Sequence, residues 1–220
     1  MVIDHHITND GFGNINLIES DAVATSEILA DYLPVFGLPI TQAVANALLT
    51  GIVTDTLGFR TSNVSSKSLR TAAMLIDYGA NMPDLYFNSL VSRSFAAARY
   101  WGEGLRKLER DEEMVWTSLT NEERQFIGYP GRDDADLITV ISSIEEADIA
   151  IIFVEQMDGH VKISWRVCPR ADTRLDVSQV ARLFGGGGHK NASGADICGS
   201  LAEVKQNVLA ATRELLVSVT

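Results

Sequence analysis

Three segments of the sequence carry residue types that could bind a metal ion or a phosphate group. The first is Asp4-His5-His6, in which a carboxylate precedes two imidazoles directly after the apolar pair Val2-Ile3. Carboxylate oxygen and imidazole nitrogen together suit manganese, zinc or iron. Neighbouring strand residues point to opposite sides, so both histidines reach one site only if the chain turns here. The alternative interpretation is a polar turn with surface histidines.

The second segment runs from Gly51 to Arg60 and contains Asp55 at the expected end of an apolar helix. The negative end of the helix dipole disfavours a carboxylate at this position. A bound cation would offset that cost, which makes Asp55 a candidate metal ligand. The alternative is an exposed aspartate that caps the following turn.

The third segment is a run of four glycines followed by His189 and Lys190. The run consists of Gly185, Gly186, Gly187 and Gly188. Such a run costs conformational entropy, but its backbone can approach a ligand closely and offers N–H groups to phosphate oxygens. It is neither a Walker loop nor a dinucleotide-binding fingerprint. A helix end followed by a linker would explain one glycine but not four, so we expect a loop that binds an anion.

An alternating stretch at 161–167 precedes this loop. Alternation places Val161, Ile163 and Trp165 on one face, and the polar face carries Lys162, Ser164 and Arg166. Arginine and serine on a common face can hold a phosphate, with the guanidinium giving paired hydrogen bonds. The alternative is an ordinary solvated strand face.

The elements that must position these residues differ between the two halves of the chain. In the first half we expect a strand over 2–4, helices over 21–33, 41–54, 65–78 and from Pro83, and a long helix over 95–108. The expected buried positions of two of these helices are Leu69, Ala72, Ala73 and Ile76, and Phe95, Ala98, Trp101, Leu105 and Leu108.

The second half reads as a mixture of strands and helices. We expect strands over 113–119, 149–154 and 161–167, and helices over 121–126, 135–144, 176–184 and 202–216. Asp176 and Gln179 form a capping-box pattern at the start of one helix. Asp158-Gly159 predicts a hairpin in which both residues take positive φ.

Composition narrows the class of protein. The chain is 46% hydrophobic and 21% charged, and its longest unbroken apolar stretch, 149–154, is far short of the roughly 20 residues that span a bilayer. The N-terminal residues lack the pattern of a signal peptide, and two cysteines do not make a disulfide framework. We therefore expect a cytoplasmic globular protein without membrane partners.

The charge distribution limits the kinds of ligand that the protein could bind. Eighteen basic against 29 acidic residues give a net charge of −11, which argues against binding of long duplex nucleic acid. Residues 108–158 carry fourteen acidic and three basic residues, whereas residues 160–190 carry six basic and two acidic, a local excess of +4. A local cationic patch on an acidic protein suits a small anionic ligand.

Taken in this order, the motifs resemble the DHH phosphoesterase family with its DHH-associated C-terminal domain, in the NrnA-type branch of oligoribonucleases and phosphoadenosine-phosphate phosphatases. Asp4-His5-His6 matches the motif that names the family. Residues 54–60 are similar to its TDTG-x-F-R segment, with Leu57 as an extra residue before the glycine. Residues 164–166 and 185–194 resemble the substrate-binding strand and the glycine-rich loop of the associated domain. The likeness covers nearly the whole chain.

The resemblance implies an α/β fold with two lobes and a cleft between them. The expected parts are a truncated parallel-sheet DHH domain at 1–92, a linker helix at 93–108, and a smaller mixed α+β substrate-binding domain at 109–220. It implies two manganese ions, with magnesium or cobalt as substitutes, and catalytic roles for Asp4, His5, His6 and Asp55. His5, Asp55 and Asp4 would be the metal ligands. The residues that would contact the substrate are Arg60, Ser164, Arg166, Gly185, Gly186, Gly187, Gly188 and His189.

The implied reaction is metal-assisted hydrolysis of very short 5′-phosphorylated RNA or of 3′-phosphoadenosine 5′-phosphate. The alternatives are a cyclic-dinucleotide phosphodiesterase or single-strand nuclease of the same superfamily, and a nucleotide-binding module without catalysis; a homodimer also stays open. The family has further aspartates upstream of its DHH motif. We therefore expect a fragment that holds the two metals incompletely and turns over little by itself.

Overall fold

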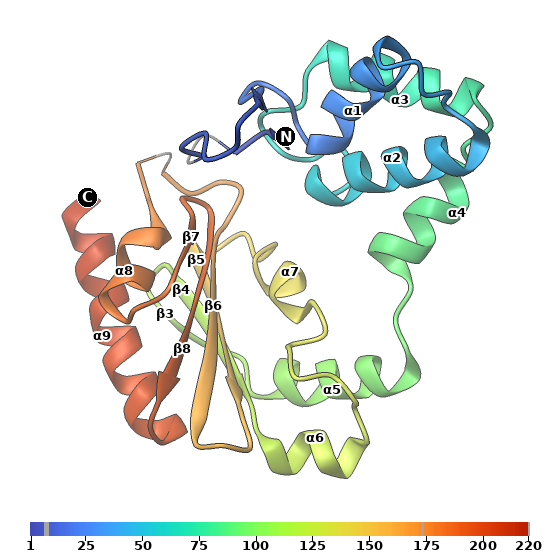
Figure 1. Cartoon of the computed structure of the whole chain (residues 1–220). Helices are drawn as coiled ribbons and strands as arrows, with labels where there is room; N and C mark the ends of the chain where they lie inside the picture. The colour runs from blue at the N-terminus through green and yellow to red at the C-terminus, as the bar shows by residue number, and fades with distance from the viewer. Residues whose placement is uncertain (7–8, 173, 220) are drawn as a thin grey trace. The chain divides into compact units, whose positions relative to one another are not determined.

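The computed structural model describes residues 1–6, 9–172 and 174–219 and divides into two compact units, residues 1–92 and 93–220 (Figure 1). The fold is a mixture of α-helices and β-strands, as the sequence predicts. The helix expected over 93–108 is α5 (Phe95–Arg106), and it is counted with the second unit. Within the described residues, no helix has both the length and the apolar character needed to cross a membrane.

The first unit pairs a very small parallel sheet with a group of helices. Its elements are β1 (Val2–Asp4), β2 (Asn16–Ile18), α1 (Thr25–Val35), α2 (Gln42–Asp55), α3 (Ser66–Asp77), α4 (Met82–Tyr86) and the π-helical turn η1 (Phe87–Val91). α2 is the central helix, because its Leu49, Ile52 and Val53 are fully buried against α1 and α3. The side chains of Thr41 and Ser65 cap α2 and α3 at their N-termini, as the sequence pattern suggests.

The start of α1 differs from the prediction. We expected Ser20 or Asp21 to cap a helix over 21–33, but the helix begins at Thr25 after the uncapped Ala24. Residues 22–24 form a buried turn instead. The side chain of Glu27 folds back onto this turn and accepts the Val23 N–H at 2.8 Å.

The buried faces predicted for two helices are also wrong. On α3 the structure buries Ser68, Ala72 and Leu75, whereas Leu69 and Ile76 are 52% and 44% exposed. On α5 it buries Ala97, Tyr100 and Gly104 and leaves Phe95 81% exposed. Both helices carry apolar residues all round, so tertiary packing, and not periodicity, selects the face.

Gly104 explains which face of α5 packs against the sheet. A Cβ atom at this position would lie 2.4 Å from a methyl group of Leu137 and 3.3 Å from one of Leu119. The Gly104 carbonyl also accepts a hydrogen bond from the Thr117 hydroxyl at 2.6 Å. A small residue is therefore what lets α5 approach the sheet closely.

A six-stranded mixed sheet in the order β3-β4-β5-β6-β8-β7 is the centre of the second unit. The strands are β3 (Glu109–Asp111), β4 (Met114–Leu119), β5 (Ile149–Glu155), β6 (His160–Val167), β7 (Gly187–His189) and β8 (Ala192–Cys198). β4 and β5 are parallel and the other pairs are antiparallel. The sequence did not indicate β3, β7 or β8 as strands.

Helices cover the two sides of this sheet unequally (Figure 1). The helices are α6 (Asn121–Ile127), α7 (Leu137–Ile141), α8 (Val177–Leu183) and α9 (Leu201–Val219), together with α5. One side is a continuous apolar core in which Phe153, Ile163 and Trp165 pack under α8 and α9. On the other side, α5 and α7 pack on β4 and β5.

Two local details of the second unit also depart from the prediction. In the loop between β5 and β6, Gly159 has φ +78°, but Asp158 is not in the left-handed region, so only one residue of the hairpin takes positive φ. The Gln156 N–H donates to the His160 carbonyl at 2.8 Å and closes this longer turn. α7 spans only Leu137–Ile141 of the helix expected over 135–144, because Ala135 and Asp136 are left-handed (φ 53° and 64°).

Candidate metal and phosphate sites

His5 and Asp55, far apart in the sequence, lie close together in the first unit. The Nε2 atom of His5 is 3.6 Å from the Oδ2 atom of Asp55. The other ring nitrogen, Nδ1, lies 3.3 Å from the Ala22 carbonyl oxygen. A carbonyl oxygen can only accept, so Nδ1 is the donor in this contact and Nε2 is the ring nitrogen that faces Asp55.

Asp4 organises the turn that brings the two histidines to the same side. Its Oδ1 atom accepts the Nδ1–H of His6 at 2.7 Å and the backbone N–H of His5 at 2.7 Å. Its Oδ2 atom accepts the Asn9 amide at 2.6 Å. The hydrogen bonds from Asn9 and His6 hold the pKa of Asp4 well below its usual range, so Asp4 is a carboxylate at neutral pH.

The backbone immediately after Asp55 has an uncommon conformation. Leu57, Gly58 and Phe59 all have positive φ, at 49°, 72° and 65°. The buried Thr56 hydroxyl donates to the Ile52 carbonyl at 2.6 Å and accepts the Phe59 N–H at 2.9 Å. Left-handed residues other than glycine cost about 1 kcal/mol or more each, so packing and the Thr56 bonds must hold this loop. Arg60 follows it and is exposed.

The donor set fits a transition-metal ion such as Mn²⁺. One ligand atom from each of Asp4, His5 and His6 lies within 4.8 Å of the others, and Asp55 adds a further carboxylate beside His5. Mixed imidazole and carboxylate donors are the set that manganese, iron and zinc accept. Because Asp4 already accepts four hydrogen bonds, His5 and Asp55 are the better-placed ligands, and Asp4 serves better to orient the two histidines.

The second unit presents an open polar floor on β6, β8 and β7, defined here by Ser164, Arg166, Ala192, Gly194 and Gly187. Register places Ser164 opposite Gly194, and Gly194 opposite Gly187. Arg166 lies opposite Ala192, which lies opposite His189. Directly opposed residues of antiparallel strands share a face, so two polar side chains border a floor of residues with little or no side chain.

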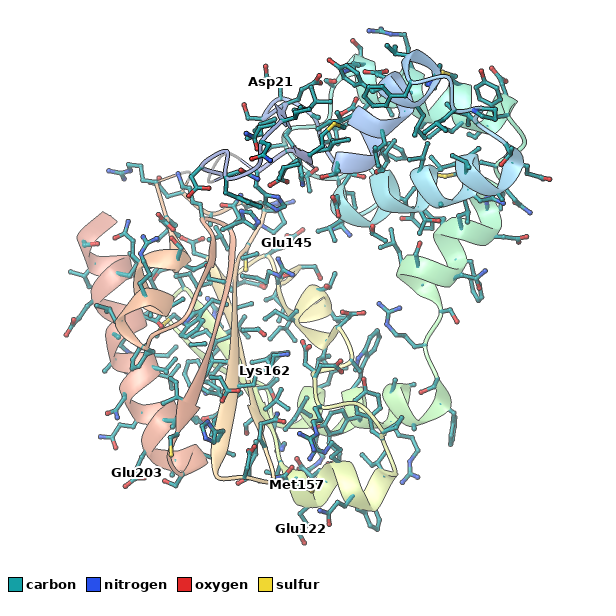
Figure 2. The ribbon with its side chains drawn as sticks, in the orientation of Figure 1. Asp21, Glu122, Glu145, Met157, Lys162 and Glu203 are labelled. Carbon is teal, nitrogen blue, oxygen red and sulfur yellow. The ribbon has the colours of Figure 1, made fainter. Side chains whose placement is uncertain are left out.

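The charges along this face are uneven. At one end Lys162 lies opposite Asp196, and Asp196 also bonds His160 at 3.1 Å; Figure 2 shows Lys162 on the side of the sheet that faces α7. At the other end the half-buried Arg166 makes no ion pair with any described residue. The uncompensated positive charge is therefore at Arg166, beside the floor.

Half of the expected glycine loop, Gly187 and Gly188, lies in the edge strand β7, and the fold itself requires three of the four glycines. Gly185 has φ +72° after α8, and Gly188 has φ +138°. A Cβ on Gly186 would lie 2.2 Å from the Gly194 carbonyl oxygen, and one on Gly188 would lie 2.6 Å from that of Ala192. A Cβ on Gly187 would meet nothing within 4 Å, and Gly187 lacks the positive φ that restricts Gly185. We had argued that folding alone would account for only one of the four glycines, and this was wrong. Gly187 is the glycine that folding does not require, so it is the one that a ligand could explain.

Comparisons with known proteins match both units. Residues 128–218 match the family model of the DHHA1 domain. The chain is 30% identical, over 97% of its length, to the bifunctional oligoribonuclease and PAP phosphatase NrnA of Thermus thermophilus, and 26% identical, over 90%, to that of Bacillus subtilis. These alignments extend over most of both units. The chain thus matches the DHHA1 domain over residues 128–218 and is similar to NrnA proteins over nearly its whole length.

The fold is shared with a solved structure as well. An exopolyphosphatase-related protein from Bacteroides fragilis superposes with a TM-score of 0.86 at 24% identity, covering 98% of this chain and 62% of that one. This similarity supports the fold. The chain spans 64% and 62% of the two curated DHH relatives named above.

Sequence reasoning missed three residues that build the DHH site. Asn9 anchors Asp4, Thr56 closes the loop after Asp55, and Glu27 holds the turn beside His5. The signal for Thr56 was its place in the motif beside Asp55, and that for Glu27 was its position three residues after Ala24, as in a capping box. Asn9 gave no signal of its own.

Proposed function

We propose that this chain is part of a metal-dependent phosphoesterase that hydrolyses short 5′-phosphorylated oligoribonucleotides and 3′-phosphoadenosine 5′-phosphate in the cytoplasm. The observation that carries the proposal is the approach of His5 Nε2, in the DHH motif, to Asp55 Oδ2 at the end of α2. The Thermus and Bacillus relatives are named as oligoribonucleases and PAP phosphatases, which supports the choice of substrates.

The proposed chemistry assigns separate tasks to the two units. His5 and Asp55 would hold Mn²⁺, with Asp4 fixing His6 beside them. A bound Mn²⁺ would lower the pKa of a coordinated water and neutralise phosphate charge. Arg166 and Ser164 would bind a phosphate of the substrate on the open polar floor, where Gly187 allows close approach. We assign further substrate contacts to Arg60, His189 and the backbone of Gly185, Gly186 and Gly188.

The test measures phosphate release from 3′-phosphoadenosine 5′-phosphate and cleavage of a 5′-phosphorylated diribonucleotide, with Mn²⁺ and with chelator. We expect hydrolysis that requires Mn²⁺ and is lost in Asp55→Asn. We also expect turnover well below that of the Thermus relative, because two ions need more ligands than Asp4, His5, His6 and Asp55 offer. Turnover equal to the relative's would contradict that second expectation.

Calorimetric binding of the same nucleotide separates an enzyme from a binding module. Tight binding that chelator does not change, together with no Mn²⁺-dependent hydrolysis, would overturn the proposal in favour of a nucleotide-binding module. Arg166→Lys should weaken binding by roughly 10-fold, since it keeps the charge but removes the paired hydrogen bonds. Arg106→Lys is the matched control, because Arg106 is exposed and pairs only with Glu103 on α5.

A further inference from the structure

Glu27, in the first turn of α1, is far more buried than an ordinary helix-capping glutamate. It is only 1% exposed, inside the apolar core around α1. Its Oε2 atom accepts the Val23 N–H at 2.8 Å, and its Oε1 atom has no hydrogen-bond partner among the described residues. Lys67, which pairs with Asp31 at 2.8 Å, also interacts electrostatically with Glu27. A buried carboxyl group with an unpartnered oxygen costs free energy.

Glu27 and His5 bind opposite ends of the same peptide group. The N–H of Val23 and the carbonyl of Ala22 belong to the same peptide unit. Glu27 binds the N–H end of this unit, and the Nδ1–H of His5 binds its carbonyl end at 3.3 Å. The peptide is planar and trans, so its N–H and C=O point in opposite directions, and fixing one fixes the other. One rigid group therefore connects the Glu27 carboxylate to the imidazole.

We propose that Glu27 is a positioning residue that sets the orientation and the tautomer of His5 through the Ala22–Val23 peptide. A negative charge at the N–H end polarises the peptide and makes the carbonyl oxygen a stronger acceptor. That favours the tautomer with hydrogen on Nδ1 and leaves the lone pair of Nε2 directed at Asp55. The metal consequence rests on the proposed role of His5 as a ligand, whereas the effect on the tautomer does not.

The position of Glu27 in α1 separates this role from simple capping. In a capping box, the side chain of the third helical residue bonds the N–H of the cap residue, which here is Ala24. Glu27 reaches one residue further back, to the peptide that touches His5. A glutamine would satisfy the same N–H, so the charge is what distinguishes the proposal from a structural role.

The test compares the full chain with Glu27→Gln and with Asp31→Asn, all metal-free and with ¹⁵N-labelled histidine. The NMR signals of His5 are assigned by their absence from the spectrum of the His5→Asn variant. Their ¹⁵N chemical shifts report which ring nitrogen carries the hydrogen. We expect Nδ1–H to dominate in the parent and in Asp31→Asn, because Asp31 bonds Lys67 and not the peptide. In Glu27→Gln we expect a shift toward the Nε2–H tautomer and an affinity for Mn²⁺ that is about 10-fold lower.

Thermal unfolding of the same samples distinguishes a loss of stability from a change of the His5 tautomer. If Glu27→Gln lowers the melting temperature but the folded fraction keeps the parent tautomer, Glu27 is a cap only and the proposal fails. It also fails if Glu27→Gln and Asp31→Asn shift the tautomer equally, because the effect would then be one of general charge. Absence of phosphoesterase activity would count against the proposed function and leave the tautomer result standing.

Discussion

The Nε2 atom of His5 faces the Oδ2 atom of Asp55 across 3.6 Å, and Asp55 is the last residue of α2. This distance is longer than a hydrogen bond and suits two ligands that share one ion. Asp55 meets the negative end of the helix dipole, as the position of the residue in the sequence suggests. On this basis the charge of Asp55 costs stability, and we propose that it binds the metal.

Asp55→Asn should therefore separate stability from metal binding. We expect the metal-free variant to be more stable by roughly 0.3–1 kcal/mol, because the unfavourable charge at the helix end is gone. Its affinity for Mn²⁺ should fall at least about 10-fold. Circular dichroism on heating and Mn²⁺ titration measure the two effects.

Asp77→Asn provides the control for that experiment, since Asp77 is an exposed aspartate at the last position of α3. It should give a similar gain in stability without any change in Mn²⁺ affinity. Equal loss of affinity in both variants would show that Asp55 acts through overall charge and not as a ligand.

The glycine run should divide into positions that serve folding and one that serves binding. Gly186→Ala and Gly188→Ala place a Cβ within 2.6 Å of backbone oxygens, so each should lower the melting temperature by several degrees. Gly187→Ala meets no atom within 4 Å and should fold like the parent, but bind 3′-phosphoadenosine 5′-phosphate more weakly. Normal nucleotide binding by Gly187→Ala would remove the run from the proposed phosphate site.

The ion pair between Lys107 and Glu123 should make the stability of the second unit depend on pH. Burial alone would raise the pKa of Glu123, but the hydrogen bonds from Lys107, at 2.5 Å, and from Thr120 outweigh it and lower the pKa below its ordinary value of 4.5. A lowered pKa contributes stability above the unfolded-state pKa, and this contribution is lost as the pH falls through the folded-state pKa.

Glu123→Gln should accordingly cost about 1 kcal/mol at neutral pH and progressively less as the pH falls below 4.5. Glutamine keeps the capping box at α6, so the variant isolates the charge. Urea unfolding followed by tryptophan fluorescence reports this unit alone, since Trp101, Trp116 and Trp165 all lie in it. Glu122→Gln, at an exposed neighbour labelled in Figure 2, should show no such trend.

Local sequence patterns were sufficient to predict much of the fold. Alternation along 161–167 correctly assigned Ile163 and Trp165 to the core and Ser164 and Arg166 to the other face, because strand geometry fixes side-chain direction residue by residue. The caps Thr41, Ser65 and Asp176 likewise follow from hydrogen bonds within a few residues.

Other features were decided only by contacts between distant segments. Periodicity could not select the buried face of α5, because the close approach at Gly104 depends on where Leu137 lies. The glycines at 186 and 188 are required by strand β8, which no local pattern connects to them. The sequence by itself determined the residue types that could do chemistry. Tertiary structure decided that Asp55 and the Ala22 carbonyl both meet His5, since these contacts join segments that are far apart in the sequence.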